Sequence, residues 1–467
     1  MRRLRFPLLF ALIASCARAP GPSAPAPLPA RPVPARDAAS PPGDPEMARR
    51  VREELLHAWN GYKQYAWGHD ELAPLSKAPH DWYRGTLLMT PVDSLDTLVL
   101  LGFKDEADEA RAYIALHLDF DQDVSVKNFE ITIRLLGGLL SSYQLTGDAR
   151  LLALADDLGR RLLPVFDSPT GMPYVNVNLR TGKTSGVESN PAEIGTLLLE
   201  FGTLAKLTRK DVYYTKAKNA LLALYSRRSP IGLVGEAIDV ETGRWLGKTS
   251  SIGSGIDSYF EYLFKAWLLF GDEDCRRMWE ESLTAVNRYL ADETTGALWY
   301  GEADMDSGRR TGTQFGALEA FFPALLALAG DRDRARRLED SAFTMWTRAG
   351  LEPDSFDYVT MKPGPEANYP LRPEIVESAY YLHALTGDAR YLAMGRRLFE
   401  DIVQNCRTDA GYAGLKSVVT REKADRMHSF FLAESLKYFY LLFGPPEAID
   451  LRLVVFNTEA HPLRRTW

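Results

Sequence analysis

The chain has 467 residues, of which 46% are hydrophobic and 25% are charged, as in an ordinary globular protein. Its formal net charge of −7 excludes a general nucleic-acid-binding protein, which would need a basic face. After the first few residues no apolar run is long enough to span a bilayer.

The N-terminal segment predicts export. Arginines precede the apolar stretch 6–14, which is too short for a membrane span and suits a signal peptide covering residues 1–15. Small residues stand directly before Cys16, as at a bacterial lipoprotein cleavage site, so Cys16 is the candidate lipidation site. The alternative is an ordinary signal peptide with an incidental cysteine. We expect a location in the cell envelope, in the periplasm or on an outer-membrane face, with the lipid as the only membrane contact.

Residues 16–46 are rich in proline and alanine and have little apolar bulk to bury. This composition is typical of an extended linker, so we expect one domain over residues 47–467. Two cysteines remain in that domain, Cys275 and Cys406. They could pair in an exported protein, but the sequence does not decide it, and free thiols are the favoured interpretation.

Short turns divide this domain after apolar helical runs. They lie at Gly102, Gly147, Arg209, Gly271, Gly330, Gly387 and Gly444, and after the first interval they are spaced by about 57 to 62 residues, one helical hairpin with its connections. Glycine supplies left-handed backbone at a helix C-terminus, and an Asp that follows can cap the next helix. The spacing predicts seven helix pairs that close into an all-α toroid.

The helices differ in their apolar faces. The runs 129–140, 257–270 and 373–382 are apolar on nearly all sides, which predicts an inner ring, whereas 149–161 is amphipathic and predicts an outer helix. Residues 453–456 read as a strand, so we expect a small C-terminal hairpin that reaches into the barrel.

Acidic residues precede most of the turns. Glu130, Glu193, Asp257, Glu319, Glu374 and Glu434 lie roughly 10 to 17 residues before their turns, at the opposite end of each inner helix. Any single one could be a helix cap. Together they predict a cavity lined by carboxylates at one mouth of the toroid, although Glu319 is the weakest member because its neighbours favour packing.

A ring of carboxylates suits glycoside hydrolysis, in which one carboxyl protonates the leaving oxygen and the other activates water or attacks the sugar. Oxygen ligands also suit Ca²⁺. The sequence has no His-Glu-x-x-His motif and no Gly-x-Ser-x-Gly motif, which disfavours a zinc protease and a serine hydrolase.

Several long motifs resemble glycoside hydrolase family 47, the class I α-1,2-mannosidases, from about residue 57 to residue 461. They lie at residues 65–76, 92–98, 129–140, 256–263, 371–378, 429–438 and 456–463, and include Leu371-Arg-Pro-Glu-Ile-Val-Glu-Ser378 and Phe456-Asn-Thr-Glu-Ala-His-Pro-Leu463. Residues 253–258 and 368–374 are closer to the degradation-enhancing mannosidase-like branch. The resemblance implies an (α/α)₇ barrel and an inverting, Ca²⁺-dependent, exo-acting α-1,2-mannosidase.

The resemblance also implies residue roles. Glu130 matches a general acid that acts through a water, Asp257 matches a second acid on that side, and either could donate the proton. Glu374 matches the general base, and Thr458 matches the residue that holds Ca²⁺. The other implied or candidate substrate-site residues are Arg134, Glu193, Arg372, Glu377, Phe430, Glu434 and Glu459. Among them Glu377, Glu434 and Glu459 would hold the waters around the ion, and Phe430 would pack on the innermost sugar.

The expected substrate is a mannose-containing oligosaccharide or glycoprotein glycan of the high-mannose type, and the expected state is a monomer. Two other functions stay open: a glycan-binding protein without turnover, and a different enzyme on a helical toroid, such as another glycosidase or an epimerase.

Overall fold

The computed structural model describes residues 43–467. The predicted signal peptide 1–15, the lipidation site Cys16 and nearly all of the linker 16–46 lie outside the described residues. Helix α1 begins at Pro45, so the last two residues assigned to the linker are helical. The start is well specified, because the Asp44 side chain accepts a hydrogen bond from the backbone N–H of Met47 and proline suits the first helical position.

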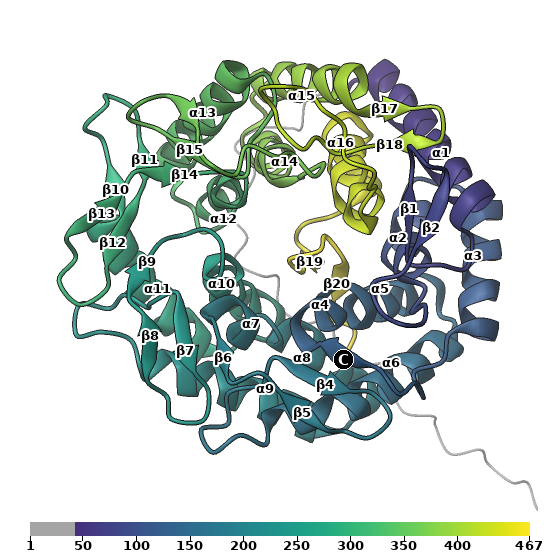
Figure 1. The fold of residues 1–467 in the computed structure, drawn as a ribbon, viewed down its shortest axis with the longest axis horizontal. Coiled ribbons are helices and arrows are strands. Elements are labelled where there is room, and N and C mark those ends of the chain that lie inside the picture. The colour runs from purple at the N-terminus through teal and green to yellow at the C-terminus, as the bar shows by residue number, and fades with distance from the viewer. Residues whose placement is uncertain (1–42) are drawn as a thin grey trace, which may run out of the picture. The chain divides into compact units, whose positions relative to one another are not determined.

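Two concentric rings of helices form a barrel in the described part of the chain (Figure 1). The outer ring consists of α1 (Pro45–Ala66), α3 (Lys104–His117), α6 (Ala149–Leu162), α9 (Asp211–Tyr225), α11 (Glu273–Tyr289), α13 (Arg332–Ala349) and α15 (Arg390–Cys406). The inner ring consists of α2 (Met89–Leu100), α4 with α5 (Asn128–Ile131, Gly137–Thr146), α7 with α8 (Pro191–Gly195, Leu198–Thr208), α10 (Asp257–Phe270), α12 (Phe322–Leu328), α14 (Glu374–Thr386) and α16 (Leu436–Phe443). Seven inner and seven outer positions confirm the predicted (α/α)₇ barrel.

The turns between inner and outer helices follow the predicted chemistry with one exception. The backbone is left-handed at six of them, for example at Gly147 (φ 74°) and even at Arg209 (φ 59°). At Gly444 the backbone is extended instead (φ −75°, ψ −177°), so the expectation of left-handed backbone was wrong there. The following Pro445 explains the difference, since a residue before proline favours extended backbone.

Short antiparallel strands lie in the connections at the end of the barrel where outer helices end and inner helices begin. Their bounds are β1 (Glu71–Ala73), β2 (Ala78–His80), β3 (Ser125–Lys127), β4 (Asn176–Asn178), β5 (Thr184–Ser185), β6 (Glu188–Ser189), β7 (Ala237–Asp239), β8 (Trp245–Gly247), β9 (Thr249–Ser250), β10 (Ala291–Asp292), β11 (Trp299–Tyr300), β12 (Glu302–Asp304), β13 (Arg310–Gly312), β14 (Gln314–Phe315), β15 (Phe356–Asp357), β16 (Lys362–Pro363), β17 (Arg407–Thr408) and β18 (Gly411–Tyr412). They form sheets of two or three strands. These strands could not be predicted from the sequence, because two or three residues are too few to show a period of two.

The C-terminal hairpin lies inside the ring, as predicted (Figure 1). Strand β19 (Val454–Phe456) pairs with β20 (Pro462–Arg464), with Val455 opposite Leu463. The tip between the strands carries Thr458 and Glu459 into the central cavity. The hairpin therefore supplies part of the floor of the central cavity.

Helix α1 begins beside the C-terminal end of α16. Gly43 lies against the backbone of Phe443 and Gly444, and Asp44 pairs with Arg396 of α15. Inner helices begin at the mouth and end at the opposite face, so residue 43 is attached to the face opposite the mouth.

The barrel wall is built without a disulfide bond in its described residues. Cys275 of α11 and Cys406 of α15 are both buried and free. Within residues 43–467, none of the helices combines the length and the apolarity that a membrane span requires.

Candidate active site

A cavity of about 300 Å³ opens at the mouth of the barrel, where the inner helices begin. Its lining includes every predicted site residue of the described chain: Glu130, Arg134, Glu193, Asp257, Arg372, Glu374, Glu377, Phe430, Glu434, Thr458 and Glu459. Their individual roles stay predictions. Glu319, the weakest member of the acidic series, is not in the lining; its Oε2 accepts a hydrogen bond from the Gly316 N–H at 2.8 Å.

One wall of the cavity carries Glu130 and Arg134. The two residues are four apart, and Arg134 donates to Glu130 Oε2 from Nη2 at 3.0 Å and from Nε at 3.3 Å. Arg134 also pairs with Glu459 of the hairpin tip through Nη1. Its guanidinium lies over the rings of Trp82 (5.4 Å) and Phe430 (5.6 Å). A buried cation thus joins the inner helix, the hairpin and the aromatic lining.

Two inner helices are locally widened into π-helix around this wall. Arg134 lies in the π-helical segment Thr132–Leu136, and Glu434 lies in a second one, Phe431–Ser435. A π-turn inserts a residue and re-aims the side chains that follow it, and such turns are frequent at functional sites. Neither insertion was visible in the sequence, because one extra residue barely disturbs an apolar pattern.

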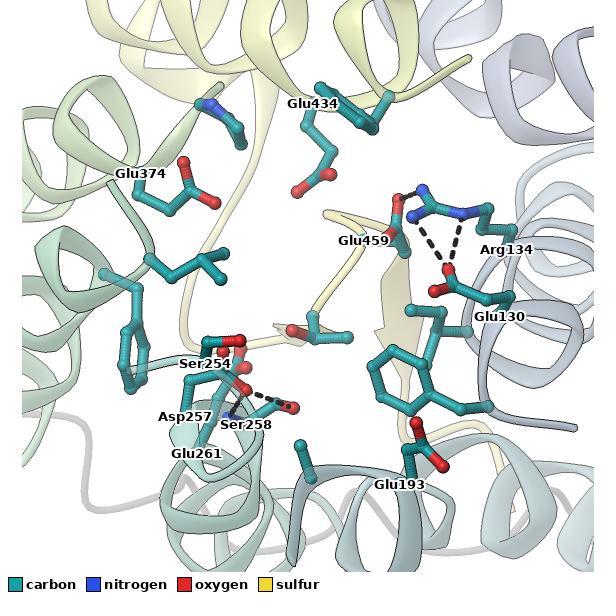
Figure 2. A pocket seen from close by; sticks show the side chains of 18 of the residues that line it. Glu130, Arg134, Glu193, Ser254, Asp257, Ser258, Glu261, Glu374, Glu434 and Glu459 are labelled. Carbon is teal, nitrogen blue, oxygen red and sulfur yellow. Dashed lines mark hydrogen bonds and ion pairs between the residues drawn. The ribbon is translucent and has the colours of Figure 1, made fainter. Parts of the chain in front are cut away.

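The opposite wall carries Glu374, the first residue of α14 (Figure 2). Arg372 Nη1 lies 3.8 Å from Glu374 Oε1, and Arg372 Nε donates to Asp354 Oδ1 at 3.0 Å. In the described residues, Glu374 Oε2 is buried and has no hydrogen-bond partner. Burial raises the pKa of Glu374 above its ordinary value, although the Arg372 guanidinium opposes the shift. The site therefore presents a carboxyl with a free oxygen across the cavity from Glu130.

Asp257 begins helix α10 on a third side of the cavity (Figure 2). The N–H of Ser258 donates to Asp257 Oδ1 at 2.7 Å, and the Ser258 hydroxyl does so at 3.2 Å. Burial raises the pKa of Asp257 to about 6 in spite of these hydrogen bonds. A carboxyl with a raised pKa can hold a proton close to neutral pH, as a general acid requires.

Further carboxyl groups lie around Thr458 at the floor of the cavity. Glu377 accepts from the Tyr438 hydroxyl at 3.1 Å. Burial raises the pKa of Glu377 and that of Glu459 to about 7, and burial with the charge of Glu459 raises the pKa of Glu434 well above its ordinary value. Eight acidic side chains line the whole cavity against three basic ones. Such an excess of buried negative charge stabilises a bound cation.

A buried polar network supports the hairpin tip from below. His461 Nδ1 lies 2.7 Å from Asp96 Oδ2, and its Nε2 lies 3.1 Å from Asp93 Oδ1. Lys437 pairs with Asp96 at 2.8 Å and donates to the Ala460 carbonyl at 2.6 Å. The tip is therefore fixed by buried charge as well as by the two strands.

Sequence reasoning missed several lining residues. Lys127 pairs with Glu193 at 2.8 Å, and Asn190, Ser254 and Glu261 also face the cavity. Glu261 could have been found, since it lies four residues after Asp257 on the same helical face. The other three lie in loops or hairpins, where no period marks the inward side.

The Ca²⁺ site stays a prediction, and the residues present show only whether they would fit such an ion. Within residues 43–467, no group of three or more His, Cys, Asp or Glu side chains is arranged to hold a metal ion directly. Thr458 lies at the cavity floor between buried Asn457 and Glu459, with carbonyl and hydroxyl oxygens of the kind that Ca²⁺ prefers. The lining contains no His or Cys, and its excess of carboxyl oxygens fits a hard divalent cation held partly through water.

Comparison with known proteins gives consistent matches. The model of glycosyl hydrolase family 47 matches residues 54–465. Alpha-mannosidase I MNS4 of Arabidopsis thaliana is 40% identical over 444 residues, which cover 90% of this chain and 70% of that protein. The ER degradation-enhancing alpha-mannosidase-like protein 2 of Homo sapiens is 37% identical to this chain. The match covers 99% of this chain and 82% of that protein. The solved alpha-1,2-mannosidase from Trichoderma reesei has a TM-score of 0.83 at 27% identity, over 91% of this chain and 100% of that one.

Proposed function

Because the chain belongs to glycosyl hydrolase family 47 and is a glycoside hydrolase with α-mannosidase activity on glycans, we propose a specific reaction for it. The proposed activity is that of an inverting, Ca²⁺-dependent α-1,2-mannosidase. The enzyme would act from the chain end and remove terminal mannose from high-mannose glycans. The observation that carries the proposal is the placement of Glu374 on one wall of the cavity, with Glu130 and Asp257 on two other sides (Figure 2). An inverting glycosidase needs a base on one face of the sugar and an acid on the other.

Glu374 is the proposed base. Its free, buried Oε2 can accept a proton from a water that attacks the anomeric carbon, and the Arg372 guanidinium at 3.8 Å stabilises the ionised form that a base requires. The attack from this side inverts the configuration at the anomeric carbon.

Asp257 is the proposed proton donor. It forms no ion pair with a cation within the described residues, whereas Glu130 is paired with Arg134. A carboxyl without a cationic partner retains its proton more readily. We propose that the proton of Asp257 reaches the leaving oxygen, with Glu130 orienting the intervening water. Phe430, which lies under the guanidinium groups of Arg134 and Arg372, would pack on the face of the sugar.

Thr458 is the proposed protein ligand of Ca²⁺. Its backbone and side-chain oxygens would bind the ion, and Glu377, Glu434 and Glu459 would accept hydrogen bonds from the waters around it. When bound, Ca²⁺ would hold sugar hydroxyl groups at the floor and offset the negative charge of the lining.

The enzyme interpretation is favoured over a binding protein without turnover, because all three proposed catalytic carboxyls reach the same cavity. The test is hydrolysis of an α-1,2-linked mannose disaccharide, followed by NMR of the first anomer released. The proposal expects β-mannose and a loss of activity in a Ca²⁺ chelator. An active enzyme that first releases α-mannose would overturn inversion, and the absence of hydrolysis of any α-mannoside would overturn the function.

We also propose export and lipid attachment at Cys16, on the evidence of the sequence pattern at residues 1–16. A C16A variant should lose incorporation of labelled fatty acid and leave the membrane fraction. Equal labelling of C16A and wild type would contradict this assignment.

A further inference from the structure

Two glutamates outside the cavity are buried without any visible hydrogen bond. Glu339 on α13 and Glu352, three residues after that helix, each have 0% exposure, and within the described residues none of their four carboxyl oxygens has a partner. An ionised carboxylate in this state would be strongly destabilising, so each requires a physical explanation.

Glu352 lies on the segment beside the proposed base, because Asp354 pairs with Arg372 at 3.0 Å and Arg372 lies 3.8 Å from Glu374. The charge that acts on it most strongly is that of Glu374 on α14, followed by those of Arg372, Asp354 and Glu339. The ring of Tyr369 is also fully buried here, and its hydroxyl donates to the Arg372 carbonyl at 3.3 Å. Burial and the charge of Glu374 raise the pKa of Glu352 well above its ordinary value.

The balance of charge around Arg372 indicates which of the three carboxyl groups, Glu352, Asp354 or Glu374, keeps a proton. Arg372 is the cation facing three carboxyls, and it bonds Asp354 directly at 3.0 Å while Glu374 lies at 3.8 Å. Glu374 must be ionised to act as the base in the proposed function. Glu352, with no donor to either oxygen, is the group left to be neutral.

A neutral Glu352 would also account for the buried oxygen of Glu374 that lacks a hydrogen-bond donor. Glu374 Oε2 is a buried acceptor without a donor, and a protonated Glu352 carries one O–H donor without an acceptor. A proton on Glu352 would therefore supply the donor that Glu374 Oε2 lacks.

We propose that Glu352 is a positioning residue for the reaction: as a neutral carboxylic acid it donates its O–H toward Oε2 of Glu374, directly or through one water, and so holds the base ionised and oriented. The proposal rests on the proposed function, in which Glu374 is the base. Glu352 does not touch the substrate, since it does not line the cavity.

The test compares two substitutions of similar volume. In E352Q an amide N–H replaces the O–H donor, whereas E352M has no donor. We expect E352M to shift the acid limb of the kcat/KM–pH profile upward by about one to two pH units, the equivalent of one hydrogen bond to a charged group. We expect E352Q to restore most of the wild-type profile. An unshifted acid limb in E352M would overturn the proposal, as would an equal shift in E352Q.

The matched control is E339M. Glu339 is equally buried and equally unpartnered, but the charges that face it are Asp340, Arg390 and Glu352, and Glu374 is not prominent among them. E339M should leave the acid limb in place whatever it does to stability. A shift in E339M as large as that in E352M would show that loss of a buried carboxyl, and not the donor, moves the profile.

A spectroscopic measurement separates this inference from the proposed function. The carbonyl stretch of a protonated carboxyl group should appear in the infrared spectrum of the folded wild type at neutral pH and lose intensity in E352Q. If the wild type hydrolyses no α-mannoside, the proposed function fails, while the infrared difference still decides whether Glu352 is neutral. Identical carbonyl bands in wild type and E352Q would overturn the neutral form.

Discussion

The guanidinium group of Arg134 pairs with the carboxylate of Glu459, 325 residues later in the chain. Arg134 also holds Glu130, so one side chain connects the acid side of the cavity to the hairpin tip that carries Thr458. The geometry of Glu130, which would orient the intervening water, and that of the proposed metal site are therefore coupled.

Replacement of Arg134 should impair stability and activity together. R134Q leaves Glu130 and Glu459 without their cation, and breaking a buried pair typically costs about 3 to 5 kcal/mol. We expect a loss of about that size in the free energy of unfolding and a decrease in kcat of about 100-fold from misplacement of the acid side. Denaturant titration and mannose release would measure the two effects. R150Q, which removes the exposed pair with Asp148, is the control and should cost less than about 1 kcal/mol.

Glu374→Gln should stop the chemistry and spare binding. The amide cannot accept the proton of the attacking water, so we expect kcat to fall by about 10² to 10⁴ while KM changes little. Isothermal titration with the disaccharide would show that binding is retained. E319Q is the matched control, since Glu319 also lies near the start of an inner helix but outside the cavity lining, and it should keep kcat within about threefold of wild type.

The proton donor should set the alkaline limb of the pH profile. A donor is active only when protonated, and the pKa of Asp257 is raised by burial to about 6, above the ordinary value of 3.8. Activity carried by Asp257 should therefore decline as pH rises through about 6. D257N should abolish this limb and retain a small, flat residual rate. A D257N profile with the wild-type alkaline limb would transfer the donor role to another group.

Removal of Ca²⁺ should lower the melting temperature as well as activity. An ion that binds only the native state at a hundredfold excess over its Kd adds about 2.7 kcal/mol to the free energy of unfolding. Calorimetry before and after chelation, and after addition of Ca²⁺, would measure the shift. T458A should reduce the Ca²⁺-dependent part of the shift. A melting temperature that is independent of Ca²⁺ in the wild type would contradict the site.

The network under the hairpin predicts an alkaline loss of stability. Burial lowers the pKa of His461, but the charges of Asp96 and Asp93 outweigh it and raise the pKa to about 9, from an ordinary 6.5. Because the folded-state pKa is raised, this contribution is fully present below about pH 6.5 and is lost as pH rises through about 9, with a size on the order of 3 kcal/mol. Unfolding titrations across this window should show the decline in wild type and a flatter dependence in H461Q. Parallel curves would contradict the assignment to His461.

Much of the barrel was predictable from sequence because helices are long and their turns have distinct chemistry. The positions of the turns, at six glycines and Arg209, predicted the number of helix pairs. The acidic residues before the turns predicted which end of the barrel is the mouth of the cavity. The sheets of the mouth were not predictable, since each strand spans two or three residues. Glu352 was not recognised either, because only the folded chain shows that a glutamate in a loop is completely buried beside Glu374.

The attachment of residue 43 at the face opposite the mouth has a consequence for how the enzyme meets its substrates. With the proposed lipid attachment at Cys16, the chain would enter the barrel at that face, and the sugar entrance would then point away from the membrane. Branched glycans on bulky glycoproteins would then enter without passing between the barrel and the surface that holds it.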